Sequence, residues 1–150
     1  SQYSLPGHRP ITIVFSENKS KKGIKEALFD GRTAVFYNDM LIGKSDYLKP
    51  LVEKCLVVDG SEDLKLGYSE DGKSSIIKLK IRNISDAPFN LRNLNDFTFE
   101  TSGDIIYIGP NSVKTISIKT KGRSINNLSF EVLNGIIAPK TYLKVNIPLN

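Results

Sequence analysis

The order of apolar and polar residues divides the chain into two parts with different repeats. Residues 1–54 combine short apolar runs with stretches of helical periodicity, whereas residues 55–150 show short segments in which apolar and polar residues alternate. Alternation with a period of two indicates a strand with one buried face, and a repeat of three to four residues indicates a helix. The pattern therefore predicts a small α/β segment over residues 1–54, followed by a β-domain over residues 55–150.

Three short strands are predicted in the first part. The runs at residues 11–15, 33–37 and 40–42 are rich in β-branched and aromatic residues. The first run is apolar on both faces, so we expect it to be covered on both sides, by an upstream segment or by the second part of the chain. Asn38 and Asp39 tolerate positive φ angles, which favours a tight hairpin turn between the last two runs.

Two helices are predicted between and after these strands. Ser20 suits the N-cap of the first helix, and Gly31 suits the position just beyond its last turn. Its apolar stripe consists of Ile24, Ala27 and Leu28. The second helix is expected over residues 45–54, with loosely defined bounds because Pro50 disfavours a helix interior.

The second part reads as a series of closely spaced short strands. Clear alternation marks strands at residues 77–82, 128–132 and 143–147. Weaker strand signals lie at residues 64–68, 97–101, 105–108 and 113–119. About seven short antiparallel strands separated by turn residues are typical of an immunoglobulin-like (Ig-like) β-sandwich. The predicted fold class is α+β and mostly β, with the small N-terminal α/β segment packed on an Ig-like antiparallel β-sandwich.

Composition and charge narrow the functional classes. Hydrophobic residues make up 39% and charged residues 25% of the chain, which is ordinary for a globular domain, and no apolar run is long enough for a membrane-spanning helix. The net charge of +5 is spread, with nine Lys and Arg against six Asp and Glu in residues 1–54 and twelve against ten in residues 55–150. Nucleic-acid-binding proteins usually concentrate their positive charge, so the sequence does not favour a nucleic-acid partner.

The candidates for nucleophilic or metal chemistry are few. Cys55 is the single cysteine and lies in an apolar run, where we expect it to be a small buried hydrophobic residue. A thiol nucleophile would need a base nearby, and the one histidine, His8, lies in a loop between two prolines. One histidine cannot build a metal site, so His8 is interpreted as a loop residue, or alternatively as a supporting group of a catalytic domain.

Other short motifs are also weak. The acidic pairs Glu62-Asp63 and Glu70-Asp71 lie beside turn residues, and adjacent side chains usually point apart, which indicates solvated turns rather than an acid–base pair. Gly43-Lys44-Ser45 resembles only the end of a phosphate-binding loop, because Asn38 stands where that motif needs a glycine. The sequence therefore predicts no catalytic, cofactor-binding or metal-binding residue.

Two basic groups offer surfaces for an anionic partner. They consist of Lys78, Lys80 and Arg82 on one predicted strand, and of Lys119, Lys121 and Arg123. The simpler interpretation of the first group is a solvated strand face that blunts pairing at a sheet edge, and the functional one is a patch for an acidic glycan or phosphate. The six tyrosines are dispersed and the chain has no tryptophan, which weakens the case for a carbohydrate platform of aromatic rings.

Residues 7–43 resemble a known family. The run Gly7-His8-Arg9-Pro10 continues into the apolar strand, and Ala27-Leu28 is followed by Gly31-Arg32-Thr33-Ala34-Val35 and later by Leu41-Ile42-Gly43. This arrangement is similar to the C-terminal region of bacterial PHP-type proteins, the polymerase and histidinol phosphatase family. The remaining residues resemble the Ig-like extension that follows the catalytic barrel in some of these proteins.

The resemblance implies a parent protein with a metal-dependent phosphoesterase domain, a distorted β/α barrel that binds several divalent ions. The ligand motifs of that family lie upstream of the matching stretch, so no catalytic residue or ligand carries over, and divalent metals are expected only in the parent domain. It also implies a secreted or periplasmic location. Because the chain begins at Ser1 and not at a methionine, we expect that processing or truncation removed an upstream segment.

The sequence thus predicts a non-catalytic accessory region that stabilises or positions the catalytic domain of a PHP-type phosphoesterase-like protein. Residues 1–54 would be the tail of that domain and residues 55–150 its Ig-like extension, with the upstream catalytic domain as partner. One alternative is a stand-alone cell-surface module that binds a glycan or an anionic ligand, which would show an exposed aromatic cluster or a basic patch. Another is a free-standing enzyme, which would need a cleft with convergent titratable groups.

Overall fold

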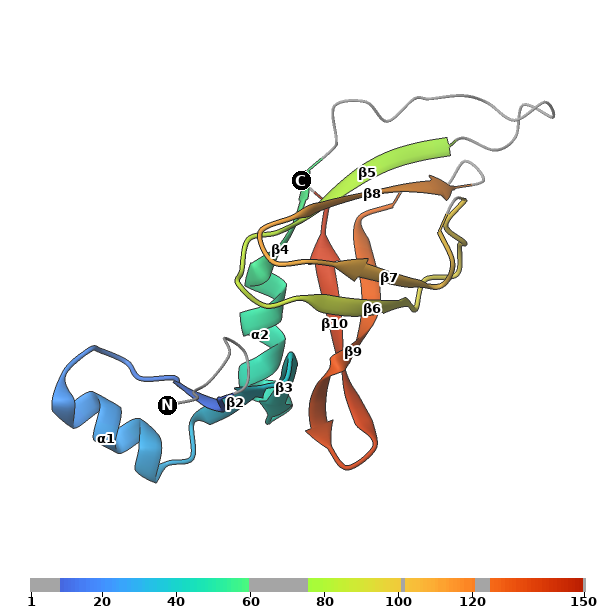
Figure 1. Cartoon of the computed structure of the whole chain (residues 1–150). Coiled ribbons are helices and arrows are strands. Elements are labelled where there is room, and N and C mark those ends of the chain that lie inside the picture. Colours follow the sequence, from blue (N-terminus) through green and yellow to red (C-terminus); the bar gives the residue numbers. More distant parts are fainter. Residues whose placement is uncertain (1–8, 60–75, 101, 121–124, 150) are drawn as a thin grey trace, which may run out of the picture.

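The computed structural model describes residues 9–59, 76–100, 102–120 and 125–149 and is built mainly from strands (Figure 1). The elements are β1 (Ile11–Val14), α1 (Lys21–Phe29), β2 (Thr33–Tyr37), β3 (Met40–Gly43), α2 (Ser45–Cys55), β4 (Leu56–Asp59), β5 (Ile76–Asn83), β6 (Phe89–Asn93), β7 (Ile105–Ile108), β8 (Val113–Lys119), β9 (Asn127–Ala138) and β10 (Thr141–Pro148). Elements β1 to α2 form an N-terminal segment that packs on a sandwich of β4 to β10 (Figure 1). The predicted fold class is confirmed.

The sandwich consists of two sheets that share one apolar core. One sheet has the antiparallel order β4-β5-β8, and the other contains β7, β6, β9 and β10. Alternate residues of each strand point inward, so that Leu79 and Ile81 of β5 are as fully buried as Phe130 and Val132 of β9. Apolar burial of this kind is the dominant favourable term in folding.

Strand β9 joins the two parts of the chain in one sheet. Strand β6 pairs with the first half of β9 and β10 pairs with both halves, each in antiparallel fashion. The second half of β9 also pairs in parallel with β3, where Ile42 lies opposite Ile136. The sheet therefore continues from the sandwich through β3 and β2 to β1. The parallel pairing between β3 and β9 was not predicted, because the sequence indicated antiparallel neighbours only.

The buried side chain of Asn134 fastens this junction. Its Nδ2 donates to the carbonyl oxygens of Asp39 and Pro88, both at 2.8 Å, and its Oδ1 accepts from the backbone N–H of Asn90 at 3.1 Å. Asn134 is only 7% exposed, so these bonds satisfy groups that water reaches poorly. One side chain thus connects the β2–β3 turn with β6 and β9.

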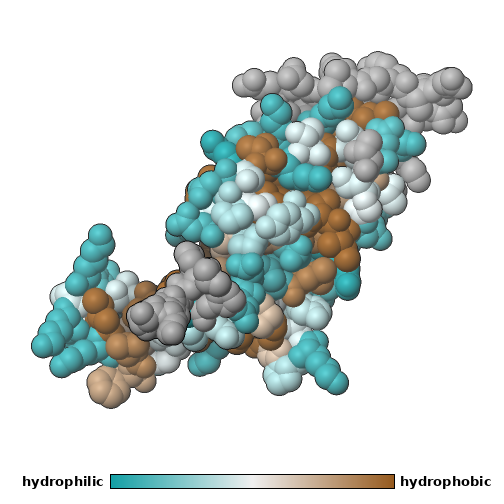
Figure 2. All heavy atoms as spheres, in the orientation of Figure 1, coloured by the Kyte–Doolittle hydropathy of each residue, from teal (hydrophilic) through white to brown (hydrophobic). Residues whose placement is uncertain are grey.

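Helix α1 begins and ends as predicted. The Ser20 hydroxyl accepts from the backbone N–H of Gly23 at 3.0 Å, which is an N-cap bond, and Gly31 follows the helix with a φ of +69°. The helix projects from the end of the sheet on the side away from the sandwich, and Figure 2 shows apolar surface on this part of the molecule. Of its nine residues only Gly23 and Ala27 are buried.

Helix α2 connects the N-terminal segment to the sandwich. Leu48 and Val52 are both 0% exposed, while Pro50 lies on the solvent side of the helix. The Glu53 carboxylate accepts from the backbone N–H of Asn146 in β10 at 2.8 Å and from Lys49 at 3.2 Å. The predicted helix is confirmed and extends one residue further, to Cys55.

Several strand predictions need correction. Strand β1 was expected to be covered on both faces by an upstream segment or by the second part of the chain, but the described residues cover it only in part, with Ile11 56% exposed and Thr12 also exposed. Strand β6 was not predicted, and the signal at residues 97–101 gives only an isolated bridge between Phe99 and Ile118. The signals at 105–108 and 113–119 are confirmed as β7 and β8. The signal at 64–68 lies outside the described residues.

Candidate functional site

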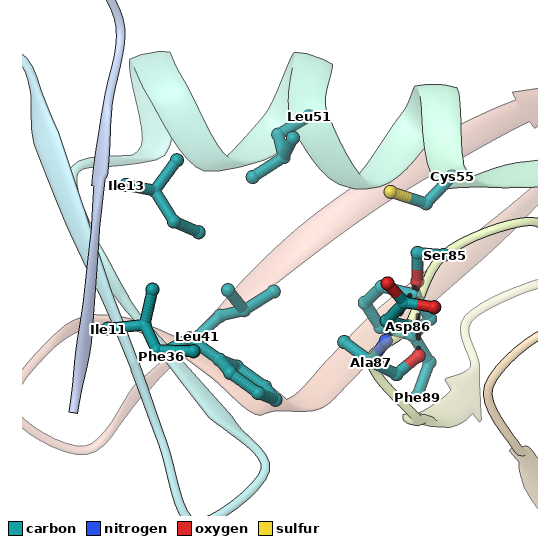
Figure 3. Close-up of a pocket in the computed structure, with 10 residues that line it drawn as sticks. All are labelled: Ile11, Ile13, Phe36, Leu41, Leu51, Cys55, Ser85, Asp86, Ala87 and Phe89. Atoms are coloured by element: carbon teal, nitrogen blue, oxygen red, sulfur yellow. Dashed lines mark hydrogen bonds between the residues drawn. The ribbon is translucent and has the colours of Figure 1, made fainter. Parts of the chain in front are cut away.

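An apolar pocket lies where the N-terminal segment meets the sandwich. It has a volume of about 350 Å³ and is bounded by the β1–β3 sheet, α2 and the turn between β5 and β6 (Figure 3). Its lining consists of Ile11, Ile13, Phe36, Leu41, Leu51, Cys55, Ser85, Asp86, Ala87 and Phe89. Figure 3 shows the apolar side chains of β1, β2 and β3 gathered at one end, and Cys55, the residues of the β5–β6 turn and Phe89 at the other. We name this cavity the junction pocket.

The junction pocket is suited to holding an apolar group and not to acid–base chemistry. Its titratable groups are Cys55, at the last position of α2, and Asp86 in the β5–β6 turn. Burial raises the pKa of the Cys55 thiol, and a hydrogen bond with Ser85 lowers it to a smaller extent. Since the thiolate is the reactive form, a raised pKa weakens the thiol as a nucleophile. Cys55 is half-buried, less than the buried position predicted for it.

The triplet Gly43-Lys44-Ser45 spans the junction between β3 and α2. Lys44 is the exposed N-cap residue of α2 and makes no side-chain cap bond. A Cβ atom on Gly43 would stand 3.0 Å from the Cβ of Ala34, so glycine here allows two strands to approach closely. The triplet therefore has a clear packing role.

The first basic group and Lys119 of the second lie on the outer face of the β4-β5-β8 sheet. Lys78, Lys80 and Arg82 are exposed on β5, as the alternation predicted, but β5 is the middle strand and not an edge. The guanidinium of Arg82 lies 3.4 Å from the carboxylate of Asp59, which balances one of the three charges. Lys119 is exposed at the end of β8, and the other two members of its group lie outside the described residues.

The remaining candidates do not converge in the described part of the chain. Tyr37, Tyr47, Tyr107 and Tyr142 come from four different elements, and Tyr47 stacks on Phe15 with ring centroids 5.3 Å apart. The predictions for His8, Glu62-Asp63 and Glu70-Asp71, and the other two tyrosines, fall outside the described residues. Within residues 9–59, 76–100, 102–120 and 125–149, no three His, Cys, Asp or Glu side chains are placed to hold a metal ion. No helix in these ranges has the length and hydrophobicity to cross a membrane.

Comparison with known proteins identifies the second part of the chain. Residues 64–148 match the model of a family described as an Ig-like domain, DUF5001. The chain belongs to this Ig-like family. A search of curated proteins gave no significant match.

One solved structure resembles the Ig-like domain together with the N-terminal segment. It is the crystal structure of a two-domain protein from Bacteroides vulgatus, described as containing a predicted PHP-like metal-dependent phosphoesterase. The two chains share 31% sequence identity with a TM-score of 0.73, and the match covers 95% of this chain. This chain spans 39% of the length of that protein. The resemblance noted for residues 7–43 is thereby confirmed at the level of the whole chain.

Sequence reasoning missed the junction pocket. Its walls come from β1, β2, β3, α2 and the β5–β6 turn, which are distant in sequence and carry no shared motif. The one local signal was the apolar character of Ile11 and Ile13 on a strand with few partners nearby. That signal indicates burial but does not reveal which elements form the opposite wall.

Proposed function

We propose that this chain is the non-catalytic accessory C-terminal region of a PHP-type, metal-dependent phosphoesterase-like protein, in which it stabilises or positions the catalytic domain. The observation that carries the proposal is the match to a two-domain protein over both the N-terminal segment and the Ig-like domain. The motifs in residues 7–43 support the same parent. The division at residue 54 and a secreted or periplasmic location remain predictions.

The contacts between the two parts explain how such a region could position a neighbour. Strand β3 is hydrogen-bonded to β9, and the buried face of α2 joins the same core as the sandwich. Because packed interiors are dense and transmit strain, the N-terminal segment and the Ig-like domain should move as one body. A catalytic domain attached to the N-terminal segment would then keep a fixed orientation relative to the Ig-like domain.

The proposal assigns the metal-dependent step to the catalytic domain of the parent. In such a site divalent ions polarise phosphoryl oxygens and activate water. The residues that line the junction pocket are mostly apolar, and its cysteine is a weakened nucleophile, so the chemistry of this pocket supports the accessory role.

The proposal is tested on the proposed parent of this chain, a two-domain protein that contains the catalytic domain and residues 1–150. It is compared with the same protein lacking residues 55–150. We expect deletion of the Ig-like domain to lower the midpoint of thermal unfolding and the amount of active enzyme, because α2 loses the core that buries Leu48 and Val52. Activity is measured as hydrolysis of p-nitrophenyl phosphate with Mn²⁺, and the 150-residue chain alone should show none. An unchanged midpoint and unchanged activity after deletion would contradict the accessory role.

A stand-alone module for a glycan or an anionic ligand has less support. The outer face of β5 offers Lys78 and Lys80, while Arg82 already pairs with Asp59. The described tyrosines are spread over four elements. We therefore prefer the accessory role.

A further inference from the structure

Helix α1 carries more apolar surface than its surroundings cover. At 100° per residue, its small and apolar side chains Gly23, Ile24, Ala27 and Leu28 fall within one arc of about 140°. Only Gly23 and Ala27 are buried, whereas Ile24 is 38% and Leu28 48% exposed. Phe29, at the end of the helix, is 88% exposed. Half of the arc is therefore covered by this chain, and the other half continues outward as open apolar surface.

A helix as short as α1 needs packing on its apolar face to be stable, and part of this face is exposed. Isolated helices shorter than about 12 residues are marginal in water, and most helical stability in proteins comes from packing of an apolar face. α1 has nine residues, and β1 is its main neighbour among the described elements. A second surface packed on Ile24, Leu28 and Phe29 would supply the missing contacts.

The position of α1 indicates what covers it. The chain enters the fold at β1, beside α1, and ten residues precede that strand in the sequence. Even fully extended, ten residues reach only about 35 Å, so a domain joined before Ser1 would stay within reach of α1. The related two-domain protein is more than twice as long as this chain, which leaves room for such a domain.

A second unpartnered surface lies on the sheet and serves as a comparison. Val35, Ile42, Ile136 and Tyr142 are cross-strand neighbours and form one row, which we name the outer row. Their neighbours Phe36 and Leu41 point to the opposite face, toward α2 and the junction pocket (Figure 3). The outer row extends to β10 of the sandwich. It therefore lies further than α1 from the start of β1, where the chain enters the fold.

We propose that the phosphoesterase domain of the same protein docks on the exposed half of the α1 arc, through Ile24 and Leu28, and on Phe29, which lies outside the arc at the end of the helix. The inference rests on the proposed function, to which it adds the contact surface. Lys25 lies one turn before Leu28 and Phe29, and Lys21 and Lys22 lie in the first turn of the helix; all three are exposed and form no ion pair with the described residues. Lys21 and Lys22 are also the first two residues of the helix, where the dipole disfavours positive charge. The docked surface should therefore be apolar with carboxylates at its rim.

Amide hydrogen exchange tests the contact between α1 and the phosphoesterase domain. It is measured in the proposed two-domain parent of this chain and in the 150-residue chain alone. We expect the amides of α1 to exchange at least about tenfold more slowly in the two-domain protein, because docking raises the free energy of local opening. The double variant Leu28→Gln/Phe29→Gln should lose most of this slowing. Glutamine keeps helix propensity, and both positions are exposed, so the fold itself should be unaffected.

A matched control introduces the same two glutamines at exposed apolar positions away from α1. Ile84→Gln/Leu94→Gln replaces two loop residues that are 53% and 42% exposed, and it should leave α1 exchange unchanged. Equal α1 exchange in the two proteins would overturn the proposal, as would protection of the outer row without protection of α1. Slowing that appears in the 150-residue chain alone and grows with its concentration would instead identify a second copy as the occupant, and would also overturn it.

The same samples separate this inference from the proposed function. A two-domain protein with protected α1 amides but without Mn²⁺-dependent hydrolysis of p-nitrophenyl phosphate would keep the docking surface and remove the phosphoesterase assignment. An active protein with unprotected α1 amides would keep the assignment and remove the docking surface.

Discussion

Replacement of Asn134 by alanine should destabilise the chain more than its small loss of volume suggests. The side chain makes three hydrogen bonds, to the carbonyl oxygens of Asp39 and Pro88 and from the N–H of Asn90. Alanine cannot replace any of them. The substitution therefore leaves two carbonyl groups and one N–H group without their partner, at a position that is 7% exposed.

The magnitude follows from the burial of these groups. A buried polar group without a partner costs about 1–3 kcal/mol. The bonds to Asp39 and Asn90 lie in partly buried places that water can enter, so the lower end of the range applies to both, whereas the bond to Pro88 is buried and a middle value applies. The sum is about 4 kcal/mol of unfolding free energy, which in a domain of this size corresponds to a decrease of roughly 8–16 °C in the unfolding temperature.

Urea unfolding followed by far-UV circular dichroism measures this difference. Asn126→Ala is the control, because Asn126 is an exposed residue and its change should stay within about 0.5 kcal/mol. Asn134→Asp should be at least as harmful as alanine, since a carboxylate would face two carbonyl oxygens. A loss below about 1 kcal/mol for Asn134→Ala would show that the junction does not depend on this side chain.

The further predictions concern three single positions. Gly43→Ala should lower the unfolding free energy by about 1–2 kcal/mol because its Cβ would stand 3.0 Å from that of Ala34, whereas Gly103→Ala, with no atom within 4 Å, should be neutral in the same urea titration. Ser20→Ala should weaken α1 by about 1 kcal/mol, seen as faster amide exchange confined to that helix. Cys55 should react with iodoacetamide at pH 8 more slowly than free cysteine, because burial raises the pKa of its thiol. The folded thiol stays protonated longer, so stability should fall as the pH rises above the ordinary value of 9.0, and Cys55→Ala should remove this dependence.

The elements that the sequence predicted well are those with local signals. The cap at Ser20, the positive φ of Gly31 and the turn at Asn38 and Asp39, with φ of 49° and 62°, all follow from residues within one turn of each other. Strand β6 was missed because its buried residues, Phe89 and Leu91, are too few to establish a period and alternate with two asparagines and an arginine.

Long-range features had no comparable signal. The parallel pairing of β3 with β9 depends on which strand ends meet in space, and alternation along one strand does not contain that information. The same holds for β1, whose apolar residues suggested two covered faces although Ile11 is 56% exposed among the described residues. The candidate surface on α1 was visible in part, because the stripe of Ile24, Ala27 and Leu28 was predicted, but only the structure shows that Leu28 is left exposed.

The shared strand β9 has a consequence for synthesis on the ribosome. Strand β3 is complete after residue 43, yet its partner on β9 begins at residue 127, near the end of the chain. Until β9 leaves the exit tunnel, β3 offers an open edge, and unpaired edges of nascent chains invite pairing with other molecules. Residues 135 and 136 therefore close a sheet edge that is open from the translation of residue 43 onward, and a chain that stalls before β9 should be a preferred target for chaperones or proteases.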